Sequence, residues 1–329
     1  MLALNKGTTV LDWSIRTAWT TRVVLLTLAL LALGAKRSQA SLGTTPNIRE
    51  IFIGRCWAFQ HVVNPTLFQS GEKNCSVLWQ HFKEAFASRD PCDVPMERYE
   101  RFAKYAQHPI PSDKVLFWSG VFPFVYRYTS LGSRYVAIGD TLTGYIVNHL
   151  HWCGTQAGPG IEYDSCPDWY ACNNTAEGAF WNIVSLHFAS LARGKVYLML
   201  NASREVAFRR ESTFGMYELP YLNHSLVKNL HVFLVKPLRH KGSETCDKGS
   251  VANLRNLVEG RGITFNCTEN PYDVVHLLCA HDHNSDHCRE ISRAVGLQLN
   301  SAPDRPILSL GLYSAFCLFL LHFLGFWEY

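Results

Sequence analysis

The chain has 329 residues, a formal net charge of +4 at pH 7 and a hydrophobic content of 47%. No run of lysine and arginine forms a basic tract, so neither charge nor composition indicates a nucleic-acid-binding protein. Part of the apolar content lies in one segment at each end of the chain.

Residues 1–40 have the pattern of a secretory signal peptide. The segment Val23–Ala35 ("VVLLTLALLALGA") is apolar or small, but it is shorter than the roughly 20 residues that span a bilayer. Basic residues precede it, and the small residues of Ser38–Ser41 follow at the spacing that signal peptidase requires. We therefore predict removal of residues 1–40. The alternative is an uncleaved membrane anchor, since the stretch before the apolar segment is unusually long.

The first half of the mature chain is predicted to be mainly helical. Apolar residues recur at helical spacing in four segments, namely Cys75–Asp90, Met96–Gln107, Asp140–Cys153 and Gly178–Ala192. Between them, Val115–Gly120 ("VLFWSG") is a short apolar run that ends in glycine, which is typical of a strand. The aromatic residues that follow, up to Tyr128, are interpreted as strand and loop packing rather than as a membrane-contacting patch.

Strands dominate the second half. Three apolar runs predict strands at Lys195–Asn201, Leu230–Lys236 and Ile263–Cys267, and Ser250–Gly262 predicts a helix before the last strand. Apolar strands separated by helices indicate a parallel sheet that is covered on both faces. We expect an α+β or α/β fold with two subdomains. A mainly helical part spans about 41–192 with one strand near 115–120. A strand-rich part spans about 193–300, with a short parallel sheet flanked by helices.

The C-terminal segment resembles the signal for a glycosylphosphatidylinositol (GPI) anchor. Ile307–Trp327 has no charged residue, and only Glu328 and Tyr329 follow, so the basic cytoplasmic flank of a membrane span is missing. The small residues near Asn300 suit lipid attachment at Asn300 or Ser301. We predict removal of residues 301–329 and an anchored protein on the extracellular face of the plasma membrane. The alternative is a type I transmembrane span.

The cysteines and sequons agree with an extracellular chain. Eleven cysteines are present, and ten remain when Cys317 of the tail is set aside, an even number that predicts a disulfide framework. Glycosylation is predicted at Asn173, Asn201 and Asn223, and is less favoured at Asn74 and Asn266, whose sequons have cysteine in the middle. The histidine-rich run "HLLCAHDHNSDHC" (His276, His281, His283 and His287) is interpreted as a solvated loop within a disulfide, and no metal site is predicted.

Three segments supply a candidate site. Trp118 stands at the end of a predicted strand, Trp181 and Ser185 lie one helical turn apart, and "ESTFGMYELP" (residues 211–220) offers the carboxylate of Glu218. Aromatic faces stack on planar rings and attract positive charge, so two indoles and one carboxylate suit a flat, cationic substrate. Taken singly, the tryptophans are more often core residues and the glutamate a solvated acid. The combination favours a site.

The same segments carry a family resemblance. "CPDWYAC", "FWNIVS", "VYLMLNAS", "STFGMYE" and "DTLTGYIVNHLHWCG" resemble the ADP-ribosyl cyclase/cyclic ADP-ribose hydrolase family of NAD-consuming ectoenzymes. The resemblance extends from about Cys56 to Cys288, and the GPI-type tail makes the chain most similar to the lipid-anchored bone-marrow stromal antigen branch.

The resemblance implies roles for individual residues. Glu218 matches the catalytic glutamate, and Trp118 and Trp181 match two tryptophans that stack on the substrate. The matching neighbours of the nicotinamide ribose and the phosphates are Ser119, Ser185, Thr213 and Phe214. Asp140 is either a residue near the site or the N-cap of the following helix. The implied disulfides are Cys56–Cys75, Cys92–Cys172, Cys153–Cys166, Cys246–Cys267 and Cys279–Cys288.

Two positions depart from the family pattern. Gly139 stands where relatives often have a second acid, and Gly120 stands where an arginine that helps to hold phosphate can occur. Both departures leave the affinity for substrate and the ratio of products open. They also leave open a second class of function, a surface receptor or adhesion protein with weak catalysis. The resemblance to lipid-anchored relatives also suggests a homodimer.

The chemistry explains why one acid is enough. Ordinary glycosidases need two carboxyl groups because an alkoxide leaving group must be protonated. Nicotinamide leaves NAD as a neutral pyridine, so one carboxylate that stabilises or traps the ribosyl oxocarbenium ion suffices. We therefore predict an NAD glycohydrolase that forms nicotinamide and ADP-ribose, with minor synthesis and hydrolysis of cyclic ADP-ribose. NAD and related dinucleotides are substrates, and no cofactor is expected.

Overall fold

The computed structural model describes residues 42–68, 71–130, 134–236, 244–281, 285–286 and 288–290. The predicted signal peptide, the predicted lipid-attachment segment with Asn300 and Ser301, and the histidines His283 and His287 lie outside these residues. Over the described ranges, none of the helices combines the length and the apolar character that crossing a membrane requires.

Helices and strands follow one another along the described chain. The α-helices are α2 (Ile48–Ala58), α3 (Cys75–Phe86), α4 (Glu100–Ala106), α5 (Phe122–Ser130), α6 (Leu142–Val147), α7 (Ala176–Ser190), α8 (Gly249–Glu259) and α9 (Tyr272–His281). The strands are β1 (Leu116–Ser119), β2 (Gly194–Asn201), β3 (Val227–Val235) and β4 (Thr264–Glu269). Shorter helical turns are η1 (Phe59–Val63), η2 (Pro65–Phe68), η3 (Met96–Tyr99), η4 (Ile138–Asp140), η5 (Phe214–Glu218) and η6 (Leu219–Tyr221).

The chain divides into two compact units. Among the described residues, the first holds the chain up to Phe117, together with Thr129–Tyr197 and Arg210–Asn229. The second holds Trp118–Tyr128, Leu198–Arg209 and the chain from Leu230 onward. The division falls within β1, β2 and β3, so each of these strands begins in the first unit and ends in the second.

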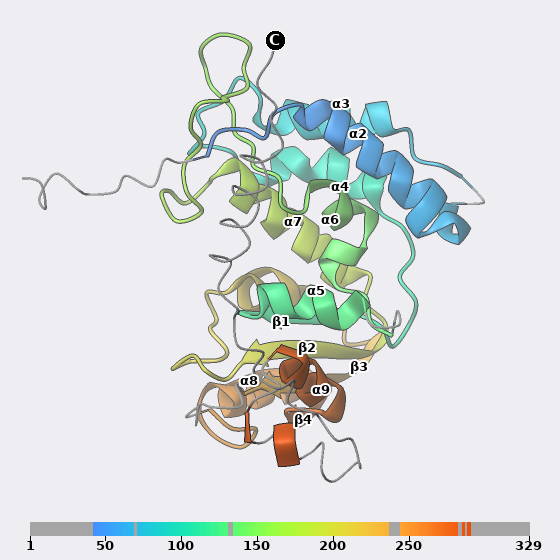
Figure 1. The fold of residues 1–329 in the computed structure, drawn as a ribbon, viewed down its shortest axis with the longest axis vertical. Coiled ribbons are helices and arrows are strands. Elements are labelled where there is room, and N and C mark those ends of the chain that lie inside the picture. The colour runs from blue at the N-terminus through green and yellow to red at the C-terminus, as the bar shows by residue number, and fades with distance from the viewer. Residues whose placement is uncertain are drawn as a thin grey trace, which may run out of the picture. The chain divides into compact units, whose positions relative to one another are not determined.

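The first unit is a cluster of helices around an aromatic core. Helices α2, α3, α4, α6 and α7 gather in this unit (Figure 1), where α2 packs on α3 and α6, and α7 packs on α4. Rings from several elements meet edge to face, with Phe82 and Phe180 at 5.7 Å and Tyr99 and Phe180 at 5.3 Å between centroids. The buried indole of Trp152 donates to the Tyr99 hydroxyl at 2.9 Å, so its one polar atom is satisfied.

Polar residues at the expected places fix where the principal helices start. The side chain of Asn74 accepts hydrogen bonds from the backbone amides of Ser76 and Val77 at the start of α3. Thr175 does the same for Gly178 at the start of α7. Such N-caps are typically worth about 1 kcal/mol each. At the start of β2, Gly194 has φ +72°, which a glycine adopts without strain.

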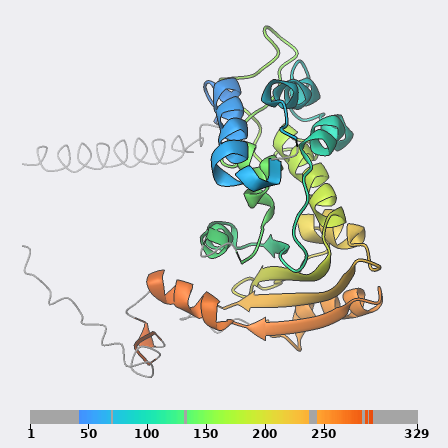
Figure 2. The same ribbon diagram turned by 90° about the vertical axis from the view of Figure 1, so that its right-hand side faces the viewer.

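The four strands form one sheet in the order β1-β2-β3-β4, which Figure 2 shows with β2, β3 and β4 side by side. Gly194 N–H donates to Leu226 O, and Ala202 N–H donates to Val235 O, so the pairing advances in the same direction along both strands. This pattern makes β2 and β3 parallel. The long connection between β1 and β2 contains α5, α6 and α7, and the connection between β3 and β4 contains α8. The predicted architecture, mainly helical with a short parallel sheet, is confirmed.

Three sequence-based expectations about elements are wrong. The aromatic run after Gly120 is helix α5, because the carbonyl of Val121 accepts from the amides of Phe124 and Val125 and starts a helical turn. The helix predicted over Asp140–Cys153 ends at Val147, since Asn148 is extended and His149 has φ +61°. The histidine-rich run was expected to be a loop, but α9 includes it as far as His281. In addition, α2 was not predicted.

All five disulfides implied by the family resemblance are present. They join Cys56 to Cys75, Cys92 to Cys172, Cys153 to Cys166, Cys246 to Cys267 and Cys279 to Cys288. Each cross-link of this kind typically contributes ~2–4 kcal/mol by restricting the unfolded chain. The largest loop, 80 residues, is closed by the bridge between Cys92 and Cys172 within the first unit.

A close approach at Gly144 yields a stability prediction. A Cβ at this position of α6 would lie 2.2 Å from the carbonyl oxygen of Ile138, which belongs to η4. Gly144→Ala must displace that turn, so we expect a loss of ~1–3 kcal/mol in the free energy of unfolding. The matched control is Gly54→Ala in α2, where nothing lies within 4 Å and a gain of ~0.5–1 kcal/mol is expected. Denaturant melts of both variants check this, and a neutral Gly144→Ala would contradict it.

Candidate functional site

The carboxyl group of Glu218 is buried. The residue ends the π-helical turn η5, only 5% of its surface is exposed, and the hydroxyl of Ser185 donates a hydrogen bond to it. Ser185 is itself buried on α7, which packs against η5 in the first unit. A glutamate that, taken singly, would more often be a solvated acid is therefore held in the interior against a helix, as a site residue can be.

The segment before Glu218 is a helical turn rather than a loop. The Ser212 hydroxyl accepts from the amide of Gly215 at 3.2 Å, and the Ser212 carbonyl accepts from Met216 at 2.9 Å. Phe214 is fully buried, with its ring centroid 5.6 Å from that of Phe117. Thr213 precedes it with helical backbone angles and is half-buried. The hydroxyl and aromatic residues of "STFG" thus build and anchor the turn that carries the carboxylate.

Helix α7 presents Trp181 one turn before Ser185, as predicted from their spacing. The indole of Trp181 is half-buried and meets Phe180 edge to face, with 5.4 Å between ring centroids. Ser185 holds the Glu218 carboxyl on the same helix. The first unit therefore brings the carboxyl, its hydrogen-bond donor and the helix that carries the indole together.

Burial controls the protonation of Glu218. Loss of hydration raises the pKa of the carboxyl to about 8, and the hydrogen bond from Ser185 opposes that rise. Within the described part of the chain, no cation pairs with this carboxyl. Because the pKa is higher in the folded than in the unfolded chain, the associated stability is complete at low pH and is lost as pH rises through about 8. Ionised Glu218 destabilises the ligand-free fold and would be stabilised by a cationic ligand.

The second unit carries the other tryptophan. Trp118 and Ser119 end β1, at the carboxyl edge of the sheet, and both are half-buried. The indole of Trp118 lies against two rings of α5, with centroid distances of 5.6 Å to Phe122 and 6.3 Å to Tyr126. In parallel sheets ligands bind beyond this edge. The predicted site residues thus form two groups, one in each unit.

Asp140 stabilises its own turn. It is not the N-cap of α6, because that position belongs to Thr141, whose hydroxyl accepts from Gly144 at 3.3 Å. The Asp140 carboxyl instead accepts from the amide of Ala137 at 2.9 Å and from the Thr129 hydroxyl. Burial raises the pKa of Asp140, and these hydrogen bonds oppose the rise. The neighbouring Gly139 is buried and packs against Gly144.

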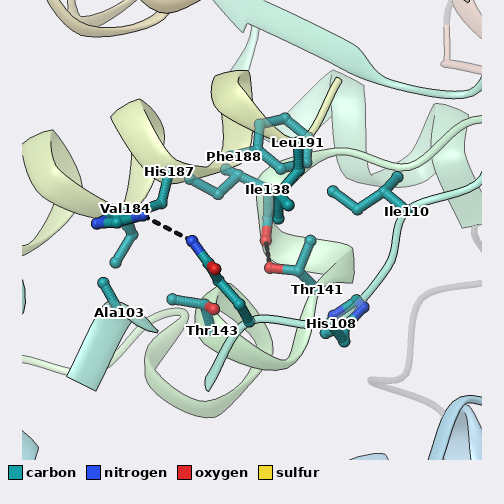
Figure 3. A pocket seen from close by; sticks show the side chains of 11 residues that line it. Ala103, His108, Ile110, Ile138, Thr141, Thr143, Val184, His187, Phe188 and Leu191 are labelled. Carbon is teal, nitrogen blue, oxygen red and sulfur yellow. Dashed lines mark hydrogen bonds between the residues drawn. The ribbon is translucent and has the colours of Figure 1, made fainter. Parts of the chain in front are cut away.

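A small cavity lies elsewhere in the first unit. It has a volume of about 20 Å³, enough for a water molecule. Three residues of α7, Val184, His187 and Phe188, line it together with Leu191 just after the helix, but neither Glu218 nor Ser185 does. The Nδ1 atom of His187, which Figure 3 labels among the side chains that line the cavity, lies 2.6 Å from the Nε2 atom of Gln107. The cavity is therefore distinct from the predicted site.

The three favoured sequons differ in their surroundings. Asn173 and Asn223 are exposed, whereas Asn201 is half-buried at the end of β2. The side-chain amide of Asn201 donates to the carbonyl of Gly120 at 3.0 Å, a contact that the sequence pattern gave no reason to expect. Among the described residues, no three histidine, cysteine, aspartate or glutamate side chains gather as a metal site would require.

Comparison with known proteins shows the family. The model of the ADP-ribosyl cyclase family matches residues 45–288, so the chain belongs to this family of enzymes. The ADP-ribosyl cyclase/cyclic ADP-ribose hydrolase of Aplysia californica is 36% identical over 251 residues, which cover 76% of this chain and 89% of the relative. The ADP-ribosyl cyclase/cyclic ADP-ribose hydrolase 1 of Rattus norvegicus is 33% identical over 247 residues, with coverage of 75% and 80%.

Solved structures agree with this assignment. A crystal structure of an ADP-ribosyl cyclase matches with a TM-score of 0.72 at 36% identity, covering 75% of this chain and 99% of the other. A second structure, of the Aplysia cyclase with its substrate NGD and product cGDPR, matches with a TM-score of 0.71, again at 36% identity, with coverage of 75% and 98%. The fold and the family expected from the sequence motifs are both confirmed.

The raised pKa of Glu218 predicts how activity depends on pH. If the carboxylate form acts, kcat/KM follows the ionisation of the free enzyme, rising about tenfold per pH unit below the pKa and levelling above about 8. Ser185→Ala removes the hydrogen bond that lowers the pKa, so its profile should shift to higher pH. Initial rates of NAD cleavage between pH 6 and 9 check both, and a flat wild-type profile would contradict the assignment.

Proposed function

We propose that this protein cleaves the bond between nicotinamide and ribose in NAD, giving nicotinamide and ADP-ribose. The observation that carries the proposal is the buried carboxyl of Glu218, held by Ser185 and unpaired with any cation among the described residues. A site built in this way is unfavourable for an ionised acid when empty, and it gains most from a ligand that brings positive charge. The nicotinamide ring of NAD is such a ligand.

The chemistry follows from the charges. When the C1′–N bond breaks, its electron pair stays on the ring nitrogen, so the pyridinium becomes neutral nicotinamide and the positive charge moves to the ribosyl oxocarbenium ion. The Glu218 carboxylate stabilises that ion, or traps it covalently. A water molecule then bonds to C1′ and gives up a proton, and ADP-ribose is released. No acid is needed for the leaving group and no cofactor is required.

The aromatic residues have a binding role in this proposal. Trp181 on α7 and Trp118 at the end of β1 offer half-buried indoles, which stack on planar rings and attract cations. Ser119 and Thr213, also half-buried, are proposed to bind ribose or phosphate oxygens. Gly139 has no side chain, so it cannot restrain the adenine ring, and water competes well for the ribosyl cation. ADP-ribose is thus the proposed main product, with cyclic ADP-ribose as a minor one.

Replacing the carboxylate tests this function. Glu218→Gln keeps the shape and removes the charge, so we expect kcat for NAD cleavage to fall at least ~100-fold, or ~3 kcal/mol, while NAD binding weakens far less. Glu211→Gln, an exposed acid seven residues earlier, is the control and should keep wild-type rates. Chromatography of early reaction products gives the ratio of ADP-ribose to cyclic ADP-ribose. Near-normal turnover by Glu218→Gln would refute the assigned role.

We also propose that the mature protein is attached to the outer face of the cell membrane by a GPI anchor at Asn300 or Ser301. The uncharged segment Ile307–Trp327 and the small residues near Asn300 support this. Treatment of expressing cells with phosphatidylinositol-specific phospholipase C should release NAD-cleaving activity into the medium. Retention of the protein, under conditions that release a known lipid-anchored control, would favour a transmembrane tail. The released form would also show by sedimentation whether the suggested homodimer forms.

A further inference from the structure

The carboxyl ends of β1 and β2 are joined by a side chain in the second unit. Gly120 follows Trp118 and Ser119 with φ +74°, and its carbonyl accepts a hydrogen bond from the side chain of Asn201 at 3.0 Å. Asn201 also accepts from the amide and the hydroxyl of Ser203, at 2.9 and 2.6 Å. The turn after β2 is therefore tied to the turn after β1, next to the Trp118 indole.

This connection places Arg204 over Gly120. A Cβ on Gly120 would lie 2.7 Å from Cζ, 2.8 Å from Nε and 2.9 Å from Nη1 of Arg204. The guanidinium plane thus occupies the space where a side chain of residue 120 would begin. Only glycine, the residue without a Cβ, leaves this position to the arginine.

The charge of Arg204 has no partner in the described part of the chain. Its guanidinium makes no hydrogen bond or salt bridge there, whereas Lys236 pairs with Glu269 and Arg255 pairs with Asp247 in the same unit. Arg204 is also exposed. A guanidinium group is planar and positively charged and has five hydrogen-bond donors, so it suits a bidentate anion such as a phosphate. Arg204 presents this group at the edge of a parallel sheet where ligands bind.

We propose that Arg204 binds the diphosphate of the dinucleotide substrate, beside the indole of Trp118. The inference rests on the proposed NAD cleavage and specifies how the site recognises its substrate. NAD has two negatively charged phosphates between its two nucleosides, and a charged arginine at the mouth of the turn compensates part of that charge. Gly120 departs from the family pattern, and this proposal gives the glycine a role of its own, because it makes room for the guanidinium of Arg204.

Substrates that differ in phosphate content test the proposal. Arg204→Ala should raise KM for NAD about 10-fold or more, with little change in kcat, because a charge-assisted hydrogen bond is lost. The KM for nicotinamide riboside, which has no phosphate, should stay unchanged. Arg204→Lys keeps the positive charge but loses the planar guanidinium group, so its KM for NAD should lie between those of wild type and Arg204→Ala. Lys248→Ala removes an exposed positive charge from the same unit and is the control.

Binding of ADP-ribose, followed by calorimetry, separates this inference from the proposed function. ADP-ribose has the diphosphate but no nicotinamide, so Arg204→Ala should weaken its binding about 10-fold even in the absence of turnover. An unchanged affinity for ADP-ribose would overturn the role of Arg204 while leaving NAD cleavage intact. An equal rise in KM for nicotinamide riboside would overturn it too, because Arg204 would then act on the turn rather than on phosphate. Wild-type protein that binds ADP-ribose but cleaves no NAD would refute the proposed function alone.

Discussion

The burial of one carboxyl group is the constraint on which the site depends. Glu218 is removed from water without a cationic partner among the described residues, and this raises its pKa to about 8. An ionised carboxylate in such surroundings is unfavourable, so the fold must hold it in place by other contacts. Three contacts do this: the packing of Phe214 against Phe117, the hydrogen bond from the Gly215 amide to the Ser212 hydroxyl, and the hydrogen bond from Ser185.

The same constraint links structure to the proposed reaction. Three disulfides, Cys56–Cys75, Cys92–Cys172 and Cys153–Cys166, and a dense aromatic core give the first unit rigidity that does not depend on Glu218. The other contacts of the fold therefore offset the free energy that burial of the ionised acid costs. A cationic ligand that binds beside the carboxylate lowers this free energy. Because nicotinamide leaves as a neutral molecule, the reaction needs charge stabilisation at C1′ and no second acid.

Much of the fold could be predicted because its signals are local. The apolar runs that predicted β2 and β4 agree with the observed strands to within two residues, and so do the predicted bounds of α7, Gly178–Ala192. The errors arise where a local pattern is ambiguous. Aromatic residues of α5 resemble a strand, and nothing in the sequence shows that His149 takes a left-handed conformation and ends α6 early. The disulfide pairing was accessible only through the family resemblance, because ten cysteines permit many pairings.

The sequence predicted which residues belong to the site, but not the contacts that hold them in place. Spacing placed Trp181 and Ser185 on one helical face, the segment at residues 211–220 offered the carboxylate of Glu218, and the family resemblance implied its catalytic role. The structure adds that Ser212 and Phe214 build the turn and that Asp140 holds its own loop. Arg204 could not be predicted from the sequence as a phosphate-binding residue. Its position over Gly120 depends on Asn201, which brings the ends of two strands together in space.

The protonation state of Glu218 in the ligand-free protein is the most direct measure of this account. Infrared difference spectra between wild type and Glu218→Gln isolate the carbonyl stretch of this one carboxyl group. We predict a protonated carboxyl at pH 6 whose band disappears as pH rises through about 8. A carboxylate that is already fully ionised at pH 6 would contradict it, because Glu218 would then lie in water or beside a cation.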